Sequence, residues 1–151
     1  MRIELTESLW RVGLLPINAV RPFAIEALAE GFSGPALFEL ADGGYGIWRE
    51  VEETFAQALI EIGCLPLTKE DASMQAAWCI CEDIASGTTE PYGGARVIGQ
   101  LRDYGQVHQL FAALSYFEEI NVDHDGRSDG YEEELRQLAR EMMVGRGKVG
   151  G

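Results

Sequence analysis

The sequence has few of the side chains that bind metal ions or act as nucleophiles. It contains 2 histidines and 3 cysteines in 151 residues. The cysteines, Cys64, Cys79 and Cys81, are odd in number and have no Cys-x-x-Cys spacing, which argues against a disulfide framework and a zinc site. We therefore expect reduced thiols, with Cys81 on the buried side of a helix, and no cofactor.

Long apolar runs are also missing. No stretch approaches the roughly 20 apolar residues that a membrane-spanning helix needs. Acidic residues at Glu4 and Glu7 interrupt the apolar segment that a signal peptide needs. These two observations predict a cytoplasmic protein that does not act at a membrane.

Basic residues are scarce as well. The chain has 12 Lys and Arg residues against 25 Asp and Glu residues, which gives a formal net charge of -13. This charge repels nucleic-acid phosphates and anionic lipids, so it argues against both as ligands. It would attract a basic protein partner, although acidic charge also simply keeps a protein soluble.

Strand patterns are absent, because apolar and polar residues do not alternate over useful lengths and no Asn-Gly hairpin signal occurs. Apolar residues instead recur every three or four positions, as at Val20, Phe23, Ala24, Ala27 and Leu28. The predicted fold class is all-α, an irregular bundle of about seven to eight short helices. The expected helices run from a Thr6 cap to about Val12, from an Asn18 cap to near Gly31, from Pro35 to Leu40, from Ile47 to Ile62, from a Thr68 capping box to Gly87, from Thr89-Glu90-Pro91 to before Gly105, from about Val107 to Ile120, and from about Tyr131 to Met143.

The composition fits one globular domain, with 46% hydrophobic and 25% charged residues in a length that supports a single core. We place this single helical domain at residues 1–144. The remaining residues, 145–151, are rich in glycine and contain no apolar anchor, so we expect them to form a flexible tail.

Two segments carry a resemblance to known proteins. Ser33-Gly34-Pro35-Ala36-Leu37-Phe38-Glu39-Leu40-Ala41 and Glu90-Pro91-Tyr92-Gly93-Gly94-Ala95-Arg96, in this order, resemble a group of small all-helical bacterial proteins without an assigned activity. The resemblance implies the fold and supplies no catalytic residues. The loop at 121–130 is longer and more acidic than that group leads us to expect.

The segment 121–132, Asn121-Val122-Asp123-His124-Asp125-Gly126-Arg127-Ser128-Asp129-Gly130-Tyr131-Glu132, matches the template of an EF-hand calcium loop. Oxygen ligands stand at positions one, three, five and nine, glycine at six and Glu132 at twelve. Against this, Asn121 replaces the usual first aspartate and Ser128 the usual apolar residue. The chain also has no second loop to pair with this one, and the apolar register of the next helix fits a different loop start. The alternative is an acidic turn in which Asp129 caps the last helix.

The sequence does not predict a group of catalytic side chains that act together. His108 has no His or Glu partner at metal-binding helical spacing, and a surface histidine is the simpler interpretation. Adjacent acids on a helix diverge by about 100°, so they do not serve one substrate together; such pairs are Glu52-Glu53, Glu82-Asp83 and Glu118-Glu119. The glycines of Gly43-Gly44-Tyr45-Gly46 precede a helix, but no Lys-Ser/Thr follows, which indicates a turn and not a phosphate loop.

Other conspicuous residues indicate helix packing. The small residues around Tyr92-Gly93-Gly94 would let two helices approach closely, and Trp10, Trp48 and Trp78 are expected to anchor helices to one another. We therefore predict a non-enzymatic interaction module that binds a basic protein through an acidic face, by analogy with toxin-neutralising immunity proteins. The alternative is a calcium-binding protein that uses loop 121–132. We assign no catalytic, cofactor-binding or metal-binding residues.

Overall fold

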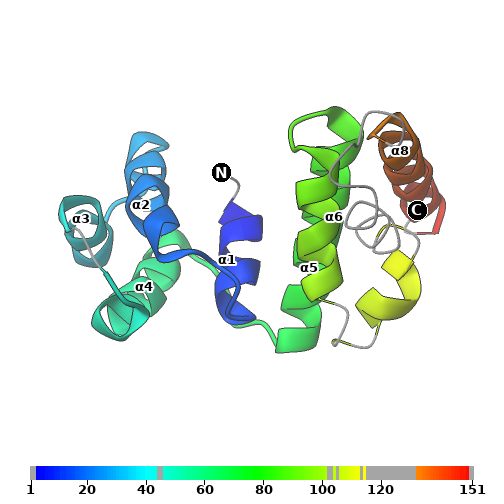
Figure 1. The fold of residues 1–151 in the computed structure, drawn as a ribbon. Coiled ribbons are helices and arrows are strands. Elements are labelled where there is room, and N and C mark those ends of the chain that lie inside the picture. The colour runs from blue at the N-terminus through cyan, green and yellow to red at the C-terminus, as the bar shows by residue number, and fades with distance from the viewer. Residues whose placement is uncertain are drawn as a thin grey trace. The chain divides into compact units, whose positions relative to one another are not determined.

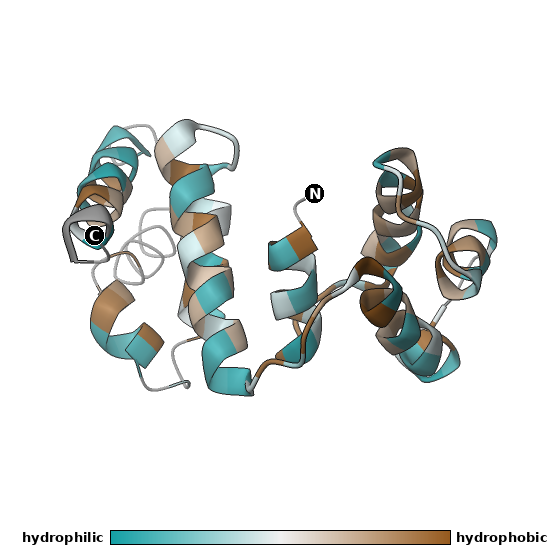
Figure 2. Ribbon diagram, turned by 180° about the vertical axis from the view of Figure 1, so that it is seen from behind, coloured by the Kyte–Doolittle hydropathy of each residue, from teal (hydrophilic) through white to brown (hydrophobic). Residues whose placement is uncertain are grey.

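A computed structural model describes residues 3–43, 46–101, 104, 106–112, 114 and 132–149. Every regular element within these ranges is a helix, which confirms the predicted all-α class (Figure 1). Each helix carries both apolar and polar bands, as the predicted periodicity requires (Figure 2). None of the helices in the described part of the chain is long and apolar enough to cross a bilayer.

The helices group into two compact units, which we call unit 1 (residues 1–68) and unit 2 (residues 69–151). The sequence pattern predicted one domain over 1–144 and did not separate these units. The boundary follows Gly63, which ends a helix in the left-handed conformation with φ of 93°. Residues 64–68 then continue without helix to the start of unit 2.

The described residues of unit 1, 3–43 and 46–68, form four α-helices and one short 3-10 helix. They are α1 (Ile3–Arg11), η1 (Ile17–Ala19), α2 (Val20–Ala29), α3 (Pro35–Asp42) and α4 (Trp48–Ile62).

The core of unit 1 is built around Phe55 of α4, whose side chain is fully buried. Three aromatic rings surround it: Trp10 at 5.2 Å, Phe23 at 5.5 Å and Trp48 at 5.6 Å between ring centroids. Tilted and edge-on ring pairs at these separations add stability beyond the apolar area that they bury. Trp10 and Trp48 therefore anchor helices, as the sequence predicted.

Side chains of neighbouring helices hold both ends of α3. At its N-terminus the Glu61 carboxylate of α4 accepts hydrogen bonds from the backbone N–H groups of Ala36 and Leu37, both at 3.0 Å. At its C-terminus the Arg21 Nε atom of α2 donates to the Ala41 carbonyl at 2.9 Å. An acid at the N-terminus and a base at the C-terminus both oppose the helix dipole, so the two contacts stabilise this eight-residue helix.

Unit 2 contains α5 (Lys69–Ser86), α6 (Pro91–Gln100), a helical segment over 106–112, and α8 (Glu132–Val149). Helix α5 packs against both α6 and α8. Gly94 of α6 lies against α5, since a Cβ atom there would come within 2.8 Å of Ile84 and 3.1 Å of Ile80. This confirms the prediction that a small residue permits close approach of two helices. Cys81 is fully buried and its Sγ lies 3.6 Å from the Ala139 carbonyl of α8.

Several predicted helix boundaries are confirmed. Pro35 begins α3, Gly63 and Gly87 follow the ends of α4 and α5, and Pro91 begins α6. The carboxylate of Glu90 caps α6 by accepting hydrogen bonds from two backbone N–H groups of its first turn.

Two predicted N-caps are wrong. Helix α1 begins at Ile3, so Thr6 is a buried residue inside it. Asn18 lies within η1, and α2 begins at Val20 with no side-chain hydrogen bond at its cap. At Thr6 and at Asn18 the backbone stays helical, although either residue could have capped a helix. The reason is that the apolar residues on both sides pack against the core.

Part of the predicted flexible tail, 145–151, is helical in the structure. Helix α8 continues to Val149, past Gly145 and Gly147. The Arg146 guanidinium lies over the Trp78 ring of α5, 4.7 Å from the ring centroid. A cation on the face of an indole is an attractive contact, so Arg146 provides an anchor that the glycine-rich composition did not reveal.

Candidate functional site

The candidate site is a pocket of about 220 Å³ in unit 1, lined by Trp10, Gly13, Leu15, Trp48 and Glu52. Its walls come from the end of α1, the turn that follows, and the first two turns of α4. Two tryptophans and one glutamate therefore line the same small space.

Local contacts fix the indoles of this pocket. The Trp48 indole N–H donates a hydrogen bond of 3.1 Å to the Leu15 carbonyl, and both tryptophans pack on Phe55. Gly13 turns the chain after α1 with φ of 77°, a backbone conformation that glycine adopts without strain. The pocket wall is thus held by the core of unit 1.

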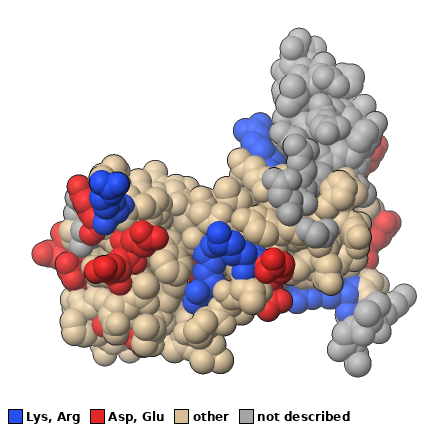
Figure 3. Space-filling model, turned by 90° about the horizontal axis from the view of Figure 1, so that it is seen from below, with Lys and Arg blue, Asp and Glu red and all other residues tan. Residues whose placement is uncertain are grey.

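Glu52 lies one helical turn after Trp48, so the two side chains share a face of α4. Glu53, the next residue, is also exposed but does not line the pocket. Helix α4 carries four glutamates and one arginine in 15 residues. Acidic side chains gather on the part of unit 1 visible in Figure 3, and the exposed glutamates of α4 include Glu50, Glu52 and Glu53.

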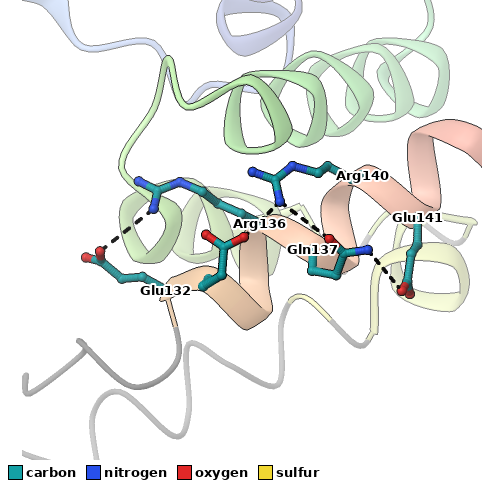
Figure 4. A network of polar contacts seen from close by, with 6 residues as sticks. Glu132, Arg136, Gln137, Arg140 and Glu141 are labelled. Carbon is teal, nitrogen blue, oxygen red and sulfur yellow. Dashed lines mark hydrogen bonds and ion pairs between the residues drawn. The ribbon is translucent and has the colours of Figure 1, made fainter.

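Helix α8 offers a useful contrast in unit 2. It contains four acidic and four basic residues, so it has no net charge. Ion pairs join Glu132 to Arg136 at 4.0 Å and Glu133 to Arg140 at 2.8 Å, and Gln137 donates to Glu141 (Figure 4). Its acids are therefore largely neutralised along the helix, whereas α4 has an excess of negative charge.

The size and lining of the pocket limit its ligands. Sites for drug-sized molecules have volumes of roughly 300–1,000 Å³, so this pocket suits a smaller group such as one side chain. Indole faces and a carboxylate both attract cations. Within the ranges described above, no group of three or more His, Cys, Asp or Glu side chains could hold a metal ion.

Several of the residues singled out from the sequence lie outside the part of the chain that the structure describes. Residues 121–131 of the loop 121–132 lie outside the described residues, so calcium binding there stays a prediction; the last residue of the loop, Glu132, opens α8. His124 and the pair Glu118-Glu119 also lie outside. His108 is exposed on the helical segment 106–112, in agreement with a surface histidine.

The remaining acidic and glycine-rich motifs belong to separate elements. Glu82 is exposed and Asp83 is half-buried on α5. Gly43 follows the end of α3 and Gly46 lies shortly before α4, while residues 44–45 lie outside the described part.

The thiols of half-buried Cys64 and buried Cys81 are poor nucleophiles. Burial, a hydrogen bond with Glu7 and the charge of Glu7 raise the pKa of Cys64 to about 12. Burial raises the pKa of Cys81 to about 11, although the charge of Arg146 acts in the opposite direction. The thiolate is the reactive form of cysteine, so neither residue is activated for catalysis at neutral pH.

Sequence reasoning identified Trp10 and Trp48 as packing anchors but did not bring them together with Glu52. The two tryptophans stand 38 positions apart, and only tertiary packing on Phe55 makes them neighbours. The one local signal in the sequence for this grouping was the spacing of Trp48 and Glu52, which is one helical turn.

Comparison of the chain with models of protein families, with curated proteins and with solved structures found no match. The resemblance to small helical bacterial proteins stays a prediction, and the site is interpreted from its own geometry.

Proposed function

We propose that this chain is a non-enzymatic protein-interaction module and that unit 1 binds a basic protein partner. A toxin-neutralising role, by analogy with acidic immunity proteins, is the specific form of this proposal.

The charge of α4 is the observation that carries the proposal. Unit 1 contains ten acidic and four basic residues, and three of its exposed glutamates fall within four positions of α4. A local excess of one charge steers a partner of opposite charge and accelerates its association.

Exposed apolar side chains in unit 1 supply the second requirement of a protein interface. Binding surfaces combine charged or polar residues with large apolar ones that the partner covers. The large apolar side chains exposed in unit 1 are Ile25, Phe38, Ile47, Ile60 and Leu65.

The experiment is affinity capture from the source cells at about 0.15 M salt, the ionic strength of the cell, followed by mass spectrometry. The expected partner is a basic protein that is released as the salt concentration rises. The variant Glu50→Gln/Glu52→Gln/Glu53→Gln should lose it.

The matched control is Glu133→Gln/Glu134→Gln/Glu141→Gln, which removes the same charge from α8 and should keep the partner. A repeated failure to recover any basic protein would contradict the proposal. Equal loss of the partner in the two triple variants would show that net charge, and not α4, directs binding.

A further inference from the structure

The pocket between α1 and α4 has a lining that selects for one type of ligand. We propose that it binds an arginine side chain of the partner, with the guanidinium group against the indoles and paired with Glu52. This inference rests on the proposed function and names the contact that unit 1 makes with a basic protein.

Arginine suits this lining better than other side chains do. Its guanidinium is planar and weakly hydrated, so it stacks on aromatic faces and pairs with a carboxylate through two parallel hydrogen bonds. Trp10 and Trp48 provide aromatic surface, and Glu52 provides the carboxylate. A pocket below the size range of drug-like ligands matches one side chain.

Two contacts of the same chemistry occur among the described residues. The Arg11 guanidinium lies 5.7 Å from the centre of the Trp10 ring, and that of Arg146 lies 4.7 Å from the centre of the Trp78 ring. Arg11 is itself paired with Glu7 at 3.4 Å, so its charge is balanced within α1. Glu52 is the acidic residue in the lining of the pocket, so its carboxylate is the group that we assign to an incoming cation.

The three indoles of the chain make the test specific. Each gives one N–H signal in a ¹H–¹⁵N spectrum, assigned with the Trp→Phe variants. The probe is N-acetyl-arginine methylamide, and its uncharged counterpart is N-acetyl-citrulline methylamide. The arginine derivative should shift the Trp10 and Trp48 signals in a saturable manner, with a dissociation constant on the order of millimolar, and leave Trp78 in place.

Adjacent glutamates provide the matched variants. Glu52→Gln should weaken binding of the arginine derivative about tenfold, as expected for the loss of a charge-assisted hydrogen bond. Glu53→Gln removes the same charge one position away and should change the affinity by less than about twofold. Both residues are exposed, so both variants should fold.

The proposal is overturned if the citrulline derivative binds equally well, if Glu53→Gln weakens binding as much as Glu52→Gln, or if no saturable shift occurs. Failure of the pocket differs from failure of the proposed function. If only the pocket proposal fails, the arginine derivative does not bind, but the basic partner is still captured through α4. If the proposed function fails, no basic partner is captured, even where the arginine derivative binds. A partner's arginine is then not the ligand of the pocket.

Discussion

The carboxylate of Glu61 occupies the space that a Cβ atom at Gly34 would need. Gly34 has φ of 162°, an extended conformation that any residue adopts, so the contact with Glu61, and not backbone strain, opposes a side chain there. Replacement of Gly34 by alanine should push the carboxylate away from the Ala36 and Leu37 N–H groups. Gly34→Ala and Glu61→Ala should each lower the free energy of unfolding by about 1 kcal/mol, measured by urea denaturation.

The double variant separates this coupling from two independent effects. Gly34→Ala/Glu61→Ala should cost no more than Glu61→Ala alone, since the cap is already lost. Glu53→Ala, on the same helix, should change stability by less than about 0.5 kcal/mol. Additive losses in the double variant would contradict the coupling.

Two glycines of α6 should respond to alanine with opposite signs. Gly94→Ala should destabilise the protein by about 1–3 kcal/mol, because the new methyl group overlaps the fully buried side chain of Ile84. Among the described residues, no other part of the molecule comes within 4 Å of where a methyl group at Gly99 would stand, so Gly99→Ala should stabilise the helix by about 0.5–1 kcal/mol. Thermal or urea unfolding of both variants checks the packing of α5 on α6, and equal effects would contradict it.

Arg146 should contribute to stability although it lies among glycines. Arg146→Met keeps much of the side-chain length and removes the cation over Trp78, so it should cost about 0.5–1 kcal/mol. It should also move the Trp78 indole N–H signal. Arg140→Met, which breaks the exposed pair with Glu133, should cost less and leave the Trp78 signal in place. An Arg146→Met variant with unchanged stability and an unmoved Trp78 signal would contradict the contact between Arg146 and Trp78.

The thiols of Cys64 and Cys81 should resist alkylation. At pH 8, a pKa of about 12 in place of 9.0 lowers the thiolate fraction of Cys64 by about a thousandfold relative to the unfolded chain. Iodoacetamide labelling followed by peptide mass mapping, in native protein and in urea, measures this for each cysteine separately. Rapid labelling of native Cys64 at pH 8 would contradict the burial and the contact with Glu7.

The same shifts have a consequence for stability. Both folded pKa values are raised, so the folded state holds these protons more tightly than the unfolded state does. The stabilising contribution is fully present below pH 9.0 and is lost as the pH rises through the folded pKa values of about 11 and 12.

Much of the fold could be predicted because its signals are local. Pro35 and Pro91 start helices, Gly63 and Gly87 follow their ends, and apolar residues recur with the helical period. Local signals also gave two wrong predictions, the N-caps at Thr6 and Asn18. Both residue types are suited to capping, but packing of their neighbours on the core places both residues inside helices.

Interactions between distant positions could not be predicted in this way. Glu61 caps a helix that begins 26 positions earlier, and Arg146 stacks on a tryptophan of another helix. The pocket has the same origin, because Trp10 and Trp48 meet only through their packing on Phe55. The residue types indicated packing, but the partners depended on tertiary structure.

The most direct test of an acidic α4 face that binds a basic protein is the association rate with the captured partner, measured at increasing ionic strength. The rate should fall by at least about tenfold between low and high salt, and the Glu50→Gln/Glu52→Gln/Glu53→Gln variant should start lower and depend less on salt. The α8 triple variant should follow the unmodified chain. An association rate that is insensitive to salt, or equal in the chain and its α4 variant, would contradict the account.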